Sequence, residues 1–412
     1  VQEEMLVAKD EEAVFKWIAR WWEAAERPEA ELMAVLKHVR FATMAEGFLR
    51  DTVRAWPALL SEEGQGVLQT SLTPGVGGVQ PLRRLGFGPR RVYLMGEGEA
   101  EAVSTVWAYD PALDSWCEVA SMAAKRFGHA AAALDGKLYV MGVMTEFQFQ
   151  DAPAQMTEPQ VYDPEADDWQ PLPNMPTDRD RLAVAAVGGK VYAIGGCIGE
   201  CVTCDAVEAY DPLSGAWTRV ASLSVARGGH TATVVEGKIY VLGGTTYDDP
   251  TYGEESERGI GEQSSDRVDM YDPANDSWQQ MAAMPTARGS HAAAVLDGKI
   301  YVSGGKCRRE STAAEELAYL DDMFDLSDAL EAYDPVADTW TVLASLSQAR
   351  EQHASAVVNG KLRVFGGRLS LPDHTRDRIS TDLVEVYSPA SNSWARAADL
   401  PCAICESVAV AL

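Results

Sequence analysis

One short pattern recurs six times along the chain: Tyr-Asp-Pro with a Trp seven residues after the Tyr, the last copy having Ser in place of Asp. The pairs are Tyr109/Trp116, Tyr162/Trp169, Tyr210/Trp217, Tyr271/Trp278, Tyr333/Trp340 and Tyr387/Trp394. Successive tyrosines are 48 to 62 residues apart. Repetition at this pitch predicts an array of one small structural unit, and an array of small sheets normally closes into a ring.

A pair of glycines marks a second point of each unit, 26 residues after the Trp. The copies are Gly195-Gly196, Gly243-Gly244, Gly304-Gly305 and Gly366-Gly367, with a weaker Gly142-Val143 and an upstream Gly96-Glu97. The distance from Trp to Gly is constant, whereas the distance from Gly to the next Tyr varies. Insertions are therefore expected in only one loop of each unit.

One unit can be divided into four strands. Residues 291–296 are mostly small and suit the crowded centre of a ring, and Asp297-Gly298 is a two-residue hairpin signal. Residues 299–303 form a second strand that ends at the double Gly, and Tyr271 and Trp278 mark the third and outer strands. The repeated Tyr, Trp and Gly are interpreted as packing positions, and we assign no chemistry to them.

The two ends of the array complement each other. The first unit, from Arg91, has no inner strand in front of it, and the chain ends where a seventh inner strand would finish. We expect residues 407–412 to supply the inner strand of the first unit. Six blades would then close without an exposed sheet edge.

The double Gly, the Tyr-Asp-Pro and the spaced Trp together resemble kelch repeats, over residues 90–412. The resemblance implies a mainly β fold, a six-bladed kelch β-propeller closed by its C-terminal strand.

The charge of the chain limits its partners. With 35 basic and 62 acidic residues, the net charge is −27. Such a chain is not expected to take nucleic acid or an anionic membrane as its main partner. No apolar run reaches the length of a membrane span. Seven cysteines without a regular framework fit a reducing compartment, so we expect a cytoplasmic location.

Residues 1–60 have a different periodicity. Val14, Trp17, Ile18 and Trp21 follow a helical spacing, and a similar stripe recurs between Leu32 and Val39. These residues predict a small helical segment. Residues 61–89 are rich in Gly and Pro and are interpreted as a linker.

Residues 12–21, residues 36–41 and Phe48-Leu49 resemble the C-terminal half of a BACK domain, which usually lies between a BTB domain and a kelch propeller. The resemblance implies a BTB–BACK–kelch parent, many of which are substrate adaptors of cullin-3 ubiquitin ligases. In that family the BTB domain dimerises and, with the early BACK helices, binds the cullin. We expect both regions upstream of Val1, so the present chain would be monomeric and keep recognition of a protein or peptide substrate.

An arginine recurs ten residues after the Trp, where each outer strand leads to the next inner strand. The copies are Arg126, Arg179, Arg227, Arg288 and Arg350, with Ile404 at the sixth position. Two interpretations are open: the arginine braces neighbouring loops, or it forms a ring of guanidinium groups that binds carboxylates or phosphates. Arginines at the positions of Arg179 and Arg181 bind acidic degrons in related kelch adaptors, so this pair is our first candidate for a partner contact.

Two long insertions are expected on the same face. Residues 245–270 carry a net charge of −6 and residues 306–332 a net charge of −5. They are either solvated loops or an acidic, partly apolar rim that selects a basic partner. The candidate rim residues are Tyr247, Tyr252, Glu254, Leu317, Leu320 and Phe324.

Other chemistry has weaker signals. Cys197, Cys201 and Cys204 have partly ligand-like spacing but no evident fourth ligand, so they are weak metal candidates and are interpreted mainly as ordinary thiols. His129, His230, His291 and His353 recur three residues after the arginine, and this regularity indicates structure. We predict no cofactor and no catalytic residue.

Two main functions remain open. The first is substrate recognition for a cullin-3 ubiquitin ligase, and the second is a kelch scaffold, for instance on the cytoskeleton, without a ligase role. A metal-dependent enzyme is a third and less favoured possibility.

Overall fold

The computed structural model describes residues 91–97, 104–142 other than 112, 125 and 127, 158–198, 202–247, 262–308, 324–370 and 378–412. The chain divides into two compact units, Val1–Pro89 and Arg90–Leu412, and every described residue belongs to the second. The helical segment and the linker predicted for residues 1–89 lie outside this set. The described residues contain no helix that could cross a membrane.

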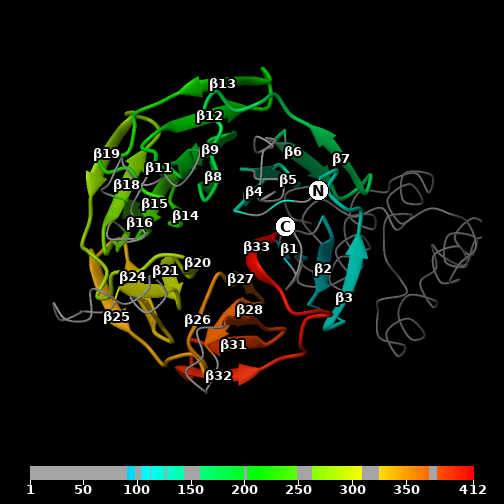
Figure 1. Cartoon of the computed structure of the whole chain (residues 1–412), viewed down its shortest axis with the longest axis vertical. Coiled ribbons are helices and arrows are strands. Elements are labelled where there is room, and N and C mark those ends of the chain that lie inside the picture. The colour runs from blue at the N-terminus through cyan, green and yellow to red at the C-terminus, as the bar shows by residue number, and fades with distance from the viewer. Residues whose placement is uncertain are drawn as a thin grey trace, which may run out of the picture. The chain divides into compact units, whose positions relative to one another are not determined.

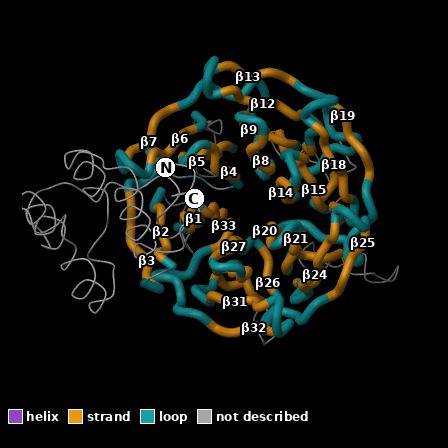
Figure 2. The backbone as a smooth tube through the Cα atoms, turned by 180° about the vertical axis from the view of Figure 1, so that it is seen from behind, coloured by secondary structure: helices purple, strands orange, loops and turns teal. Residues whose placement is uncertain are grey.

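Six four-stranded antiparallel sheets are arranged around a central axis, as the sequence repeat predicted (Figure 1). The inner strands of blades 1 to 6 are β33 (Cys405–Ala411), β4 (Ala130–Leu134), β8 (Ala183–Val187), β14 (Thr231–Val235), β20 (Ala292–Leu296) and β27 (Ala354–Val358). Seen from behind, these strands lie nearest the axis (Figure 2). Their many Ala and Val side chains allow six strands to approach one another closely.

The second strand of each blade carries most of the core. These strands are β1 (Val92–Glu97), β5 (Lys137–Met141), β9 (Lys190–Ile194), β15 (Lys238–Leu242), β21 (Lys299–Ser303) and β28 (Lys361–Phe365). The third strands are β2 (Val106–Asp110), β6 (Gln160–Asp163), β12 (Val207–Asp211), β18 (Val268–Asp272), β24 (Leu330–Asp334) and β31 (Val384–Ser388).

The outer strands form the perimeter of the ring (Figure 2). They are β3 (Ser115–Val119), β7 (Asp168–Pro171), β13 (Ala216–Arg219), β19 (Ser277–Gln280), β25 (Thr339–Val342) and β32 (Ser393–Arg396). The repeated Tyr and Trp lie opposite each other on the third and outer strands, as in the pair Tyr271↔Trp278. Their rings lie 4.9 Å apart between centroids in this pair and are tilted by 38°.

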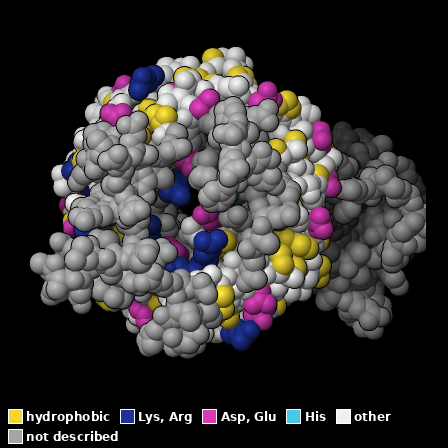
Figure 3. All heavy atoms as spheres, viewed as in Figure 1, with side chains coloured by type: hydrophobic (Ala, Val, Ile, Leu, Met, Phe, Trp, Pro, Cys, Tyr) yellow, Lys and Arg dark blue, Asp and Glu magenta, His cyan; other side chains and the backbone are white. Residues whose placement is uncertain are grey.

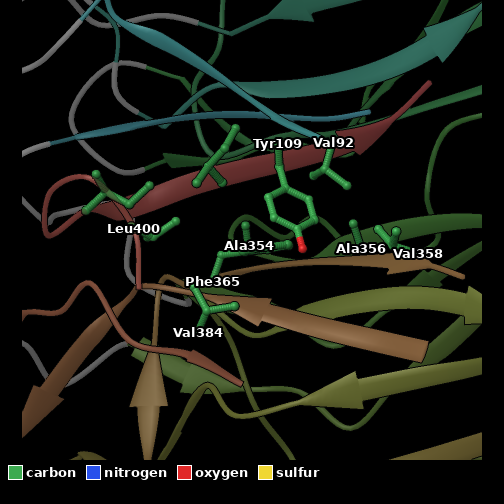
Figure 4. Packing of buried hydrophobic residues seen from close by; sticks show 10 residues of the cluster. Val92, Tyr109, Ala354, Ala356, Val358, Phe365, Val384 and Leu400 are labelled. Atoms are coloured by element: carbon green, nitrogen blue, oxygen red, sulfur yellow. The ribbon is translucent and has the colours of Figure 1, made fainter. Parts of the chain in front are cut away.

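The C-terminal strand closes the ring. Strand β33 pairs with β1 in antiparallel register, for example Leu94↔Ala409, to give the sheet order β3-β2-β1-β33. The strand begins at Cys405, two residues before the start that the sequence suggested. The junction of blades 6 and 1 is filled by an apolar cluster that includes Val92, Tyr109, Phe365 and Leu400 (Figure 4).

Neighbouring blades are joined by a repeated set of aromatic contacts. The Tyr of one second strand packs on the Tyr of the next blade's third strand, in the pairs Tyr93–Tyr162, Tyr139–Tyr210, Tyr192–Tyr271, Tyr240–Tyr333 and Tyr301–Tyr387. At the junction of blades 6 and 1, Arg363 replaces the first Tyr and lies 4.8 Å from the centroid of the Tyr109 ring.

Polar contacts accompany these rings between blades. The indole nitrogen of Trp278 donates to the carbonyl of Ala221 at 2.8 Å, and the Asp276 carboxylate accepts from the Ala221 amide at 2.8 Å and from the Tyr271 hydroxyl at 2.6 Å. The indoles of Trp169, Trp217, Trp340 and Trp394 make the same inter-blade bond. The repeated Tyr-Asp-Pro and Trp thus hold adjacent blades in register.

Short hairpins extend from the ends of the second strands, where the double Gly lies. They are β10 (Cys197–Ile198) with β11 (Val202–Thr203), β16 (Thr245–Tyr247) with β17 (Glu262–Ser264), β22 (Lys306–Arg308) with β23 (Phe324–Leu326), and β29 (Arg368–Ser370) with β30 (Arg378–Ser380). β29 also pairs with β26 (Arg350–Glu351). All of these hairpins follow the double Gly, so the variable loops predicted from the sequence share one face.

Candidate functional site

The mouth of the central channel on this face is formed by one residue from the start of each inner strand. These six residues, the mouth ring, are Gly128, Arg181, Gly229, Ser290, Gln352 and Glu406, and all have positive φ angles between 44° and 61°. Backbone amides link the ring from blade to blade, for example from Arg181 to the carbonyl of Gly128 and from Gly229 to that of Arg181, both at 2.8 Å. This left-handed geometry favours Gly, so side chains at the other positions are displayed at a local conformational cost.

The side chains of the mouth ring carry both charges. Arg181 and Glu406 are half-buried and lie on either side of Gly128, which has no side chain. Gln352 donates to Glu406 at 2.7 Å. Burial raises the pKa of the adjacent Asp180 to about 6, with Arg181 opposing this shift and Glu406 adding to it. Figure 3 shows basic and acidic side chains together around the hollow at the middle of the ring.

The hairpins form a rim around this mouth. Backbone bonds between Asp180 and Cys197 attach β10 to the link beside Arg181. Ser264 of β17 donates to the Lys306 carbonyl of β22 at 3.3 Å, which joins two neighbouring hairpins. The cross-strand pair Ile198↔Val202 is exposed, with 41% and 57% of their surfaces accessible. The rim therefore combines apolar and polar groups next to the charged mouth.

The predicted rim residues are only partly described. Phe324 is half-buried at the start of β23, and the Lys306 ammonium lies 4.8 Å from its ring centroid. Tyr247 ends β16, and its side chain is outside the described set. Tyr252, Glu254, Leu317 and Leu320 also lie outside the described residues. The acidic rim remains a prediction from the sequence.

The five repeated arginines are inside the protein. Arg126, Arg179, Arg227, Arg288 and Arg350 are each at most 1% exposed. Arg179 pairs with Glu208 at 2.6 Å and Arg288 with Glu331 at 2.8 Å, while Arg227 pairs with Asp269 and Arg350 with Glu385. Each also donates to backbone carbonyls, as Arg350 does to Gly366 at 3.1 Å and Arg288 to Gly304 at 2.8 Å.

This placement corrects the expectation of a guanidinium ring that faces a partner. The described contacts agree with the alternative interpretation, in which the arginine braces neighbouring loops, because all five groups are buried and four of them pair with a carboxylate of the fold. Of the pair Arg179 and Arg181, only Arg181 reaches the mouth.

The sequence contains a signal for these ion pairs that the repeat analysis missed. The carboxylates are Glu208, Asp269, Glu331 and Glu385, and each lies two residues before a repeated Tyr. In blade 1 the arginine position is Ile404 and the carboxylate position is Trp107, so both charges are absent together. Comparing positions within the repeat would have shown an acidic residue at this position in the four blades whose arginine forms an ion pair.

The repeated histidines are buried below these arginines. His230 donates through Nε2 to the Ile194 carbonyl at 3.1 Å. His291 contacts Thr231 and His353 contacts Ser303, both at 2.9 Å. Burial, aided by the neighbouring arginines, lowers the pKa of His129, His230 and His291 to about 3 and that of His353 well below its usual range. They are neutral packing residues at physiological pH, as their regularity predicted.

Comparison with known proteins finds a family match for each of the two parts of the chain. The family model of the KLHDC2/KLHL20/DRC7 Kelch-repeats domain matches in three overlapping segments, residues 96–305, 176–367 and 225–407. The chain belongs to the kelch-repeat family. A second model, BACK (BTB And C-terminal Kelch), matches residues 1–54. The resemblance noted from the sequence is thus confirmed for both segments.

Several kelch relatives are similar over part of their length. Kelch-like protein 23 of Homo sapiens is 28% identical over 66% of this chain and 43% of its own, and Kelch-like protein 15 of Danio rerio is 30% identical over 72% and 38%. The chain thus spans less than half the length of these relatives. A solved structure described as the structure of YjhT superposes with a TM-score of 0.55 at 16% identity, covering 69% of this chain and 87% of that one, which supports the propeller fold.

The structure does not bring Cys197, Cys201 and Cys204 together as a metal site within its described residues. Cys197 and Cys204 are buried, and Cys201 lies outside the described residues. Among the residues that the structure describes, no group of three or more His, Cys, Asp or Glu is placed to hold a metal ion.

Proposed function

We propose that this chain is the substrate-recognition part of a BTB–BACK–kelch adaptor for a cullin-3 ubiquitin ligase. The observation that carries the proposal is the order of its domains, a BACK match at residues 1–54 followed by the kelch ring. A kelch scaffold does not need a BACK segment, so this order favours the adaptor over the scaffold. The proposal places the protein in a reducing compartment such as the cytoplasm.

We further propose that a protein or peptide substrate binds at the mouth ring and the surrounding hairpins. Three features support this face: the hairpins all extend from it, Arg181 and Glu406 offer opposite charges near each other, and Ile198 with Val202 is an exposed apolar pair next to Arg181. Protein interfaces commonly combine such apolar anchors with complementary charges.

The binding face can be tested by charge reversal at the mouth. Proximity labelling in cells would compare the unchanged protein with Arg181→Glu and with Arg219→Glu, which makes the same charge change on the exposed outer strand β13. We expect Arg181→Glu to lose a set of labelled proteins that Arg219→Glu keeps. Equal labelling by both variants would contradict this face.

The ligase role needs a separate measurement. Full-length protein, including any sequence upstream of Val1, should co-precipitate cullin-3, and its captured substrates should accumulate when cullin-3 is depleted. Absence of cullin-3 from the precipitate, with substrate capture intact, would refute the adaptor role and favour the scaffold.

A further inference from the structure

Blade 2 departs from the other blades at the buried arginine. Arg126 is as deeply buried as its counterparts, at 1% exposure, but the carboxylate position of its blade is Gln160. Among the described residues, no carboxylate pairs with Arg126. The one hydrogen bond that Arg126 makes to a described residue runs from Nη2 to the backbone carbonyl of Glu158 at 2.5 Å.

Polar atoms with no hydrogen-bond partner are concentrated at this position. Nη1 of Arg126, Nε2 of His129 and Oε1 of Gln160 are all buried and have no hydrogen-bond partner in the part of the chain that the structure describes, whereas the corresponding atoms are bonded in most other blades. His129 and Gln160 are 5% and 7% exposed. The buried guanidinium of Arg126 therefore lacks the carboxylate that the arginines of blades 3 to 6 have, and its Nε and Nη1 donors have no partner among the described residues.

Burying a guanidinium group without a counter-ion destabilises the folded state. The effective penalty for an ion taken out of water is several kcal/mol unless a counter-charge or a full set of hydrogen bonds offsets it. Consistent with this, burial lowers the pKa of Arg126 to about 10, with no neighbouring acid to oppose the shift. Arginine still remains protonated at neutral pH, so the charge must be compensated in another way.

We propose that blade 2 contains a buried binding site for a small singly charged anion, which sits on Arg126 where the other blades have a carboxylate. The depth of the site favours a small free anion such as chloride or formate over the side chain of a partner. The net charge of −27 does not exclude an anion, because salt at 0.15 M screens the repulsion from surface charges more than about 8 Å away. This proposal does not depend on the proposed function.

Thermal unfolding of the 412-residue protein tests the site. Sodium chloride would be exchanged for sodium gluconate, whose anion is too large to enter, at a constant ionic strength of about 0.15 M. A ligand that binds only the folded state raises the unfolding temperature, and we expect chloride to raise it by about 2 °C over gluconate. Sodium formate in place of chloride would show whether the site also accepts a carboxylate.

Gln160→Glu is the decisive variant, since it supplies the missing carboxylate from the chain itself. It should unfold at a higher temperature than the unchanged protein in gluconate and lose the difference between chloride and gluconate. Gln170→Glu, on the exposed face of the outer strand β7, is the matched control and should keep that difference. An unchanged protein with equal stability in chloride, formate and gluconate would overturn the proposal, as would a chloride effect that persists in Gln160→Glu.

Discussion

At the residue scale, the buried arginines and their carboxylates are the most specific feature of the ring. The same pair is present in four blades with small differences, and each difference has an energetic consequence. Arg350 is the only described arginine that pairs with Glu385, whereas Asp269 is bound by both Arg227 and Arg267. Removing one partner of a buried pair leaves an uncompensated charge, which costs more than the pair itself contributes.

We therefore expect Arg350→Ala to lower the free energy of unfolding by about 3–5 kcal/mol. Arg227→Ala should cost clearly less, because Arg267 still donates to Asp269 at 2.7 Å through Nε. Denaturant unfolding measures both values, with Arg219→Ala on the exposed part of β13 as the control. Equal losses in the two variants would show that the second arginine does not compensate.

The histidines predict how stability depends on pH. His129, His230 and His291 have a pKa of about 3 in the folded state because of burial, against about 6.5 in an unfolded chain. Between these values the unfolded state binds more protons, so stability is full above pH 6.5 and falls as the pH drops toward 3.

In the middle of this window, each of these histidines should lower the free energy of unfolding by about 1.4 kcal/mol for each unit that the pH falls. Asp180 acts in the opposite direction between about pH 4 and 6, because its folded pKa of about 6 is raised. Denaturant unfolding from pH 7 to 4 should show a net loss of stability. His230→Gln should make the dependence of the unfolding free energy on pH less steep, by about 1.4 kcal/mol per pH unit, which corresponds to one bound proton. An unchanged slope would show that His230 is not buried and neutral.

At the element scale, the bonds between blades can be separated from the packing of the rings. Trp278 and Trp116 occupy the same repeat position, but Trp278 donates to Ala221 while the buried indole nitrogen of Trp116 has no hydrogen-bond partner among the residues with described positions. Trp→Phe keeps most of the aromatic packing and removes the donor. A hydrogen bond contributes about 1 kcal/mol, and an unsatisfied buried donor contributes nothing or a penalty.

Trp278→Phe should thus destabilise the protein by about 1 kcal/mol more than Trp116→Phe. Calorimetric unfolding of the two variants measures the difference. Similar losses would mean that packing rather than the indole bond determines the contribution of the repeated Trp.

The elements show which parts of the structure a sequence can predict. The repeat specified the four strands of each blade, the position of the variable loops and the closure by the C-terminal strand, because each follows from local spacing. The burial of Arg179 or Arg288 did not follow, since their carboxylates lie 29 and 43 residues further along the chain and meet them only in the folded blade. The mouth ring was also missed: positive φ at Arg181 or Gln352 has no sequence mark, because Gly occurs at only two of the six positions.

At the scale of the whole molecule, the junction of blades 6 and 1 is unlike the other five. Arg363 replaces a Tyr, and the Trp116 indole makes no inter-blade bond to a described residue. Blade 1 also has Ile404 and Trp107 in place of the Arg and carboxylate of blades 3 to 6. Besides its contact with the Tyr109 ring, Arg363 makes a distant ion pair with Asp114, at 3.9 Å, and Asp114 is largely exposed. This is also the only place where the ring is closed by strand pairing between the two ends of the propeller, β1 and β33.

A ring should open first at its weakest junction, because local opening follows the contacts with the lowest free energy. We expect backbone amides of β33 to exchange with deuterium faster than those of β20, the inner strand of blade 5, although both are inner strands. Arg363→Tyr would restore the aromatic pair with Tyr109 and should slow exchange in β33 while leaving β20 unchanged. Exchange of β33 at the same rate as β20 would mean that pairing of β1 with β33 compensates fully for the missing inter-blade contacts.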